Sequence, residues 1–203
     1  MHGFDNGLHG TPFDSPPMLL VRDYLNKAQQ QALWHEARHY PLRQPQVTVF
    51  GQSHPIPRRQ VWFADDGCDY LYSGLLVRAQ PWPKYVARLR QKLWRDWQFS
   101  SNGVLVNHYA NGQECMGWHS DNEAEIQPCS DIASITLGAA RDFVIRHRRT
   151  GEKLTLLLAS GDLLLMRWPM QQHWQHALPK RLKVKSPRVN FTFRLLQPGF
   201  HSH

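Results

Sequence analysis

The clearest strand pattern in the sequence is RVNFTFR, from Arg188 to Arg194. Polar and apolar side chains alternate along it without a break, which is the period of two that a β-strand requires. Arg188, Asn190, Thr192 and Arg194 therefore share one face. Two arginines on such a face are costly to bury unless anions pair with them. A small dicarboxylate would satisfy both guanidinium groups by bidentate hydrogen bonds, and an exposed polar face is the alternative.

The half of the chain that holds this stretch contains further short strand-like runs, with no helical pattern between them. Glycines mark the breaks, as is typical of turns between strands. Regular short strands without intervening helices indicate a sandwich or a barrel. The expected strands cover residues 104–109, 132–137, 143–146, 154–158, 162–168 and 188–196.

The first half of the chain has a different pattern. A flexible tail is expected over residues 1–20. Helical spacing predicts one helix over residues 22–40, and a second begins after prolines 81 and 83 and ends near residue 97. Short strands are expected at 47–50 and 58–63. The predicted fold class is mainly β with flanking helices (α+β), in which residues 21–100 and 101–198 form one integrated domain.

Composition limits the possible function classes. The chain has 203 residues, 41% of them apolar, which suffices for a buried core and argues against wholesale disorder. The formal net charge is +8, which favours a polyanionic partner, nucleic acid before an anionic membrane. Three widely spaced cysteines argue against a disulfide framework and a cysteine-rich zinc site. With no apolar leader or membrane-spanning run, an intracellular protein that does not enter membranes is expected.

Candidate metal ligands lie upstream of the arginine strand. His119 and Asp121 are two residues apart, so in an extended segment both side chains point the same way. A second histidine is available at His176, with His173 as a competitor. Two histidines and one carboxylate leave positions open on Fe(II) for a cosubstrate and oxygen. In a chain with 12 histidines the pair also arises by chance.

These motifs together resemble the AlkB family of Fe(II)/2-oxoglutarate dioxygenases. The resemblance covers about residues 45–197, and the strand with both arginines is its most specific part. Upstream, three segments are similar to the nucleotide-recognition segment of the homologues that act on double-stranded DNA. The resemblance implies a double-stranded β-helix (jelly-roll) core with an N-terminal nucleotide-recognition lid. The three segments are Val49–Gly51, Pro57–Gln60 and Tyr72–Gly74.

The family's roles transfer to matching positions of this sequence. The resemblance implies that His119, Asp121 and His176 bind the iron. It implies that Arg188, Asn190 and Tyr109 hold the distal carboxylate of 2-oxoglutarate, and that Arg194 and Asn107 lie near the carboxylate that chelates iron. Tyr72 would stack on the damaged base, opposite the imidazole of His119, and Glu123 would contact the polar edge of that base. The residues expected on the substrate side are Phe50, Arg58, Tyr72, Ser73 and Glu123.

The resemblance implies an oxidative demethylase that repairs N-alkylated bases such as 1-methyladenine and 3-methylcytosine in DNA. Succinate, CO2 and formaldehyde would be released. Double-stranded DNA is the favoured partner, single-stranded DNA and RNA remain possible, and a monomer is expected. An RNA demethylase or a non-catalytic nucleic-acid-binding barrel are the alternatives. The expected location is the cytoplasm of a bacterium or the nucleus of a eukaryote. Arginines 58, 59, 146, 148 and 149 are candidates for phosphate contacts, although residues 146–149 also suit a solvated turn.

Overall fold

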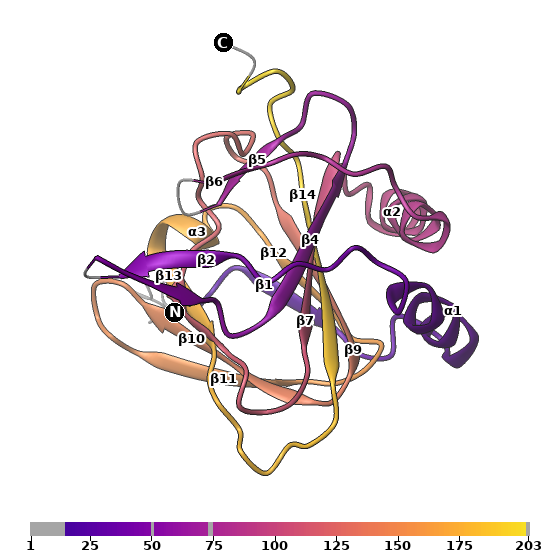
Figure 1. Cartoon of the computed structure of the whole chain (residues 1–203). Helices are drawn as coiled ribbons and strands as arrows, with labels where there is room; N and C mark the ends of the chain where they lie inside the picture. The colour runs from indigo at the N-terminus through magenta and orange to yellow at the C-terminus, as the bar shows by residue number, and fades with distance from the viewer. Residues whose placement is uncertain (1–14, 50, 73–74, 202–203) are drawn as a thin grey trace, which may run out of the picture.

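Two antiparallel sheets form the body of the protein in the computed structural model, which describes residues 15–49, 51–72 and 75–201 (Figure 1). The larger sheet has six strands in the order β1 (Met18–Val21), β12 (Leu163–Met166), β9 (Ile132–Gly138), β14 (Arg188–Arg194), β7 (Gly103–Tyr109) and β4 (Arg59–Ala64). The smaller sheet has the order β11 (Lys153–Leu158), β10 (Arg141–His147), β13 (Trp174–Leu178) and β8 (Met116–His119). The prediction of a mainly β fold is confirmed.

Two helices cover the outer face of the larger sheet (Figure 1). They are α1 (Lys27–Ala37) and α2 (Lys84–Trp97). Their apolar residues join the core that contains Phe191 and Phe193 of β14, both fully buried. Truncating such a phenylalanine to alanine costs about 3–5 kcal/mol in other proteins. The alternation of β14 thus places its apolar face under the helices and its polar face between the two sheets.

The N-terminal boundary differs from the sequence prediction. Met18–Val21 forms β1 and pairs with β12, so the flexible tail predicted for residues 1–20 is wrong at residues 18–20. The first helix begins at Lys27 rather than near residue 22, because Asn26 caps it. The Asn26 side chain accepts the backbone N–H of Gln29, and the Gln29 side chain accepts that of Asn26, which satisfies two donors that a helix start leaves free.

Several short elements were not predicted because they lack a long alternating pattern. Two of them, β8 and β13, carry histidines within the smaller sheet. The others are β3 (Gln52–Pro55), which pairs with β2 (Gln46–Val49), the hairpin of β5 (Tyr70–Tyr72) and β6 (Leu75–Val77), and α3 (Met170–His173). Strand β4 pairs with β7, so the segment before residue 100 contributes a strand to the larger sheet. No helix in the described part of the chain is long and apolar enough to cross a membrane.

Candidate metal centre and active site

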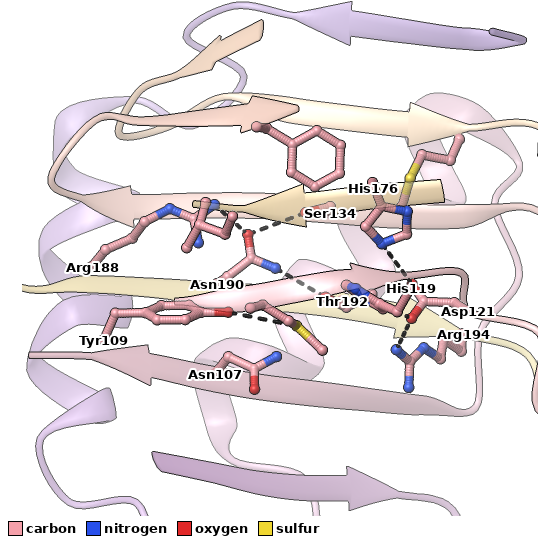
Figure 2. A pocket seen from close by; sticks show the side chains of 14 residues that line it. Asn107, Tyr109, His119, Asp121, Ser134, His176, Arg188, Asn190, Thr192 and Arg194 are labelled. Carbon is pink, nitrogen blue, oxygen red and sulfur yellow. Dashed lines mark hydrogen bonds and ion pairs between the residues drawn. The ribbon is translucent and has the colours of Figure 1, made fainter. Parts of the chain in front are cut away.

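A small cavity of about 40 Å³ lies between the two sheets (Figure 2). The inward face of β14 supplies its polar wall. Pairing with β7 sets Arg188 opposite Tyr109 and Asn190 opposite Asn107, so four predicted side chains meet through strand register alone. The smaller sheet supplies the facing wall. The polar lining residues are Asn107, Tyr109, His119, Asp121, Ser134, His176, Arg188, Asn190, Thr192 and Arg194.

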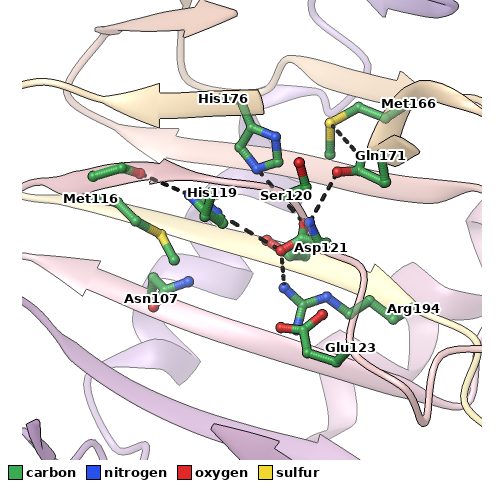
Figure 3. Close-up of polar contacts among 12 residues, drawn as sticks. Asn107, Met116, His119, Ser120, Asp121, Glu123, Met166, Gln171, His176 and Arg194 are labelled. Carbon is green, nitrogen blue, oxygen red and sulfur yellow. Dashed lines mark hydrogen bonds and ion pairs between the residues drawn. The ribbon is translucent and has the colours of Figure 1, made fainter. Parts of the chain in front are cut away.

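Three potential metal ligands converge at one end of this pocket (Figure 3). His119 on β8 and His176 on β13 are register partners, and Asp121 follows two residues after His119. The Nε2 atoms of both histidines lie 3.8 Å from the Asp121 carboxylate oxygens, and one donor atom from each residue lies within 4.8 Å of the others. His173 is not part of the cluster, so the geometry selects His176 from the two alternatives.

The protonation of the cluster suits a divalent cation. Burial lowers the pKa of His176 to about 3, and the neighbouring His119 adds to the effect, so the ring is neutral at pH 7. The Nδ1–H of His119 donates to the Gly117 carbonyl at 2.9 Å, which leaves Nε2 facing the cluster. Burial opposes the charge on Asp121, but Arg194, His176 and His119 outweigh it and hold the carboxyl pKa below its ordinary value. Two imidazoles and one carboxylate fit Fe(II).

Neighbouring groups orient Asp121 and His176. Arg194 Nη2 donates to Asp121 Oδ1 at 2.6 Å, and the Asp121 backbone N–H donates to Gln171 Oε1 at 3.0 Å. The Phe143 ring stacks on His176 with centroids 5.1 Å apart. Arg194 was expected near the iron-chelating carboxylate of the cosubstrate, and its Nε and Nη1 atoms are buried without hydrogen-bond partners among the described residues. No local pattern predicts the roles of Gln171 and Phe143, which come from distant segments.

Arg188 lies at the other end of the pocket as a buried cation. Its side chain is 2% exposed, and Nη2 donates to Thr136 Oγ1 and Asn190 Oδ1, both at 2.9 Å. Nε has no hydrogen-bond partner, and no carboxylate within the described ranges forms an ion pair with the guanidinium. Burial lowers its pKa to about 10 and raises that of the neighbouring Tyr109. An uncompensated buried guanidinium beside a neutral phenol suits a carboxylate ligand.

Two of the predicted substrate-side residues, Arg58 and Glu123, lie at the wall of the pocket. Arg58 is 3% exposed, and its Nε donates to Asn107 Oδ1 at 3.0 Å. The side chain points inward to the pocket wall, and its contact with the nucleic acid stays a prediction. Glu123 is half-buried and accepts a hydrogen bond from the Tyr70 hydroxyl, which sequence reasoning missed. Phe50, Ser73 and the Tyr72 side chain lie outside the part of the chain that the structure describes.

The comparison with protein families agrees with this site. The profile of the 2OG-Fe(II) oxygenase superfamily matches residues 17–194. The chain belongs to this superfamily and is a dioxygenase that uses Fe(II) and 2-oxoglutarate. The structure titled "The structure of OsALKBH1" superimposes with a TM-score of 0.58 at 16% identity, covering 89% of this chain and 97% of that one. This likeness confirms the jelly-roll core.

Sequence relatives identify the family within this superfamily. The chain is 41% identical to the mouse protein named DNA oxidative demethylase ALKBH2, over 82% of this chain and 73% of that protein. It is 40% identical to the human protein of the same name, over 81% of this chain and 66% of that protein. The chain therefore spans about two thirds to three quarters of these relatives. These identities assign it to the AlkB family within the superfamily.

Proposed function

We propose that this protein removes alkyl groups oxidatively from N-alkylated bases in DNA, such as 1-methyladenine and 3-methylcytosine. The relatives named DNA oxidative demethylase and the net charge of +8 support a DNA substrate. The observation that carries the reaction class is the pocket itself, with the His119–Asp121–His176 cluster at one end and at the other Arg188, which forms no ion pair with any described residue.

Different polar side chains of the pocket serve the metal and the cosubstrate. His119, Asp121 and His176 would hold Fe(II), which with 2-oxoglutarate and O2 supplies the oxidation of the alkyl carbon. Arg188, with Tyr109 and Asn190, binds the distal carboxylate of the cosubstrate. Ser134 Oγ and Arg188 Nη2 donate to Asn190 Oδ1, at 3.1 and 2.9 Å, so this amide is held in one orientation before any ligand enters.

The base approaches from the His119 side of the metal centre. The His119 side chain is 26% exposed, whereas those of Asp121 and His176 are 3% and 4% exposed. Glu123 lies beside Arg194 at this end of the pocket (Figure 3), where its carboxylate can accept from an exocyclic amine of the base. A base stacked in a duplex cannot reach a buried metal, so the nucleotide has to be flipped out or already unpaired. N-Methylation of the pairing edge lowers the cost of flipping the correct base.

Exposed arginines support phosphate binding, and one of them, Arg148, lies beside the metal ligands. Arg148 donates to Ser120 Oγ at 2.8 Å, and Ser120 stands between the metal ligands His119 and Asp121. Arg149 and Arg59 are also exposed. We propose double-stranded DNA as the preferred form, with Phe50 as the residue that fills the gap left by the flipped base, and a nucleotide-recognition lid formed around the hairpins β2–β3 and β5–β6. A monomer is proposed as the functional unit.

A succinate assay across several substrates tests the proposal. Iron-dependent succinate formation should rise when methylated duplex DNA is added and stay at its basal level with the unmethylated duplex. A larger rise with the matching methylated RNA would instead support an RNA demethylase. Tight binding of the duplex without any iron-dependent turnover would support a non-catalytic nucleic-acid-binding barrel.

A further inference from the structure

Glu125 is a buried acid that the proposed reaction does not use. It lies four residues after Asp121 and is 2% exposed. Its Oε1 accepts the backbone N–H of Leu71 in β5 at 2.7 Å and lies 3.5 Å from His201 Nε2. Taking a carboxylate out of water is costly, so a buried one is informative about what it holds. Here it joins the loop after the metal ligands to the β5–β6 hairpin.

A second acid of the same loop holds the preceding residue of β5. Glu123 accepts the Tyr70 hydroxyl, and in Figure 3 it lies beside Arg194 at the metal end of the pocket. Residues 70 and 71 of the hairpin are thus fixed to two acids of the loop that begins at Asp121. A displacement of β5 at this point would move the hairpin relative to the metal centre.

The C-terminal segment adds a second set of contacts to the same place. After β14 it runs alongside β5 (Figure 1). The Gln197 side chain donates to the carbonyls of Ala124 and Ile126, at 3.2 and 3.5 Å, and the Gly199 N–H donates to the Gly67 carbonyl at 2.8 Å. Residues 197–201 therefore connect the acidic loop with the turn that precedes β5.

The hairpin needs such anchoring because little apolar packing holds its outer face. Its strands have three residues each and form a sheet of their own. A two-stranded hairpin is at best marginally stable in water. Leu71 and Leu76 are 39% and 41% exposed, so they contribute little burial. Tyr70 packs on Trp62 in a buried cluster on the inner face, so the contacts of the acidic loop and the C-terminal segment add polar anchors to one apolar one.

We propose that Glu125, supported by His201, is a positioning residue that sets the β5–β6 hairpin against the metal centre and thereby sets affinity for the alkylated nucleotide. This inference rests on the proposed function, since the hairpin is taken to bind the base. Glu125 touches neither iron nor cosubstrate, so its removal acts on nucleic-acid binding and leaves cosubstrate turnover in the absence of DNA unchanged.

Replacement of Glu125 by two residues tests the proposal. Glu125→Ala removes the acceptor for the Leu71 N–H and should raise KM for a methylated duplex about tenfold, equal to about 1.4 kcal/mol. Glu125→Gln keeps a carbonyl oxygen at the same place and should restore most of the affinity. His201→Ala should give a smaller rise. Glu152→Gln removes an exposed acid and serves as the control for charge.

Hydrogen exchange gives a readout that does not depend on turnover. The Leu71 amide should exchange faster in Glu125→Ala than in wild type or Glu125→Gln. The proposal would be overturned if both Glu125→Ala and His201→Ala kept the wild-type KM for the methylated duplex and the wild-type exchange rate of the Leu71 amide. So would a parallel fall of melting temperature and of DNA-independent succinate formation, which indicates a general structural role. If wild type itself does not act on methylated DNA, the proposed function fails, whereas the exchange result still reports whether Glu125 anchors β5.

Discussion

Replacing Arg188 by lysine removes the forked donor at the closed end of the pocket while keeping its charge. The guanidinium already donates to Thr136 and Asn190 from Nη2, so its remaining donors are the ones available to a ligand carboxylate. A lysine ammonium is a point charge with no planar pair of N–H groups. If it keeps the Thr136 and Asn190 contacts, it has at most one hydrogen bond left for the cosubstrate.

The expected loss of affinity for 2-oxoglutarate in Arg188→Lys is that of one charge-assisted hydrogen bond. Such a bond contributes about 1.5–3 kcal/mol, and each 1.4 kcal/mol is tenfold in affinity, so KM for 2-oxoglutarate should rise about 10- to 140-fold. The assay is succinate formation against cosubstrate concentration at saturating iron and methylated DNA. KM for DNA should change little, because Arg188 is 2% exposed and faces away from the entrance.

The matched control is Arg38→Lys, which makes the same exchange at an exposed site after α1. It should leave both KM values at those of wild type. An unchanged KM for 2-oxoglutarate in Arg188→Lys, with a normal melting temperature, would refute the assignment of Arg188 to the cosubstrate.

Three further predictions concern the metal, pH and strand preference. His176→Ala should abolish iron binding and turnover, whereas His173→Ala should keep most of both; equal losses, measured by iron titration and succinate release, would contradict the ligand assignment. The metal-free protein should lose stability as pH falls from about 6.5 to 3, by up to about 1.4 kcal/mol per pH unit, because the unfolded chain then binds a proton that buried His176, with its pKa near 3, does not. Denaturant titrations should show that the unfolding free energy of His176→Phe depends less steeply on pH. A dependence identical to that of wild type would count against a neutral buried imidazole. Phe50→Ala should slow repair of methylated double-stranded DNA far more than that of the single-stranded lesion; a common fall of both initial rates, with a lower melting temperature, would identify Phe50 as a core residue instead.

Strand periodicity made one wall of the pocket predictable from the sequence. The alternation at 188–194 fixed which residues share a face, and pairing with β7 then brought Asn107 and Tyr109 beside them. The long-range partners carry no such local signal. Gln171 contacts Asp121 only because the α3 region folds back, and Phe143 meets His176 only through the register of β10 and β13.

The direction of a side chain in a short irregular segment was also beyond sequence reasoning. The positive charge balance made Arg58 a candidate for phosphate, whereas in the structure its side chain is buried and donates to Asn107. Strands β8 and β13 were missed because each is short and mixes aromatic, polar and histidine residues to serve the metal site. The local pattern is least informative where the residues bind ligands.

The most direct test follows one methyl group through the reaction. A duplex that carries a single 3-methylcytosine is incubated with the protein, Fe(II) and 2-oxoglutarate under air, and the oligonucleotide is then analysed by mass spectrometry, with formaldehyde and succinate measured in the same sample. We predict loss of the methyl group with one formaldehyde released per methyl removed, dependent on both iron and cosubstrate and absent in His176→Ala. An unchanged oligonucleotide, with succinate still formed at the rate seen without DNA, would contradict the assignment of this protein as a DNA demethylase.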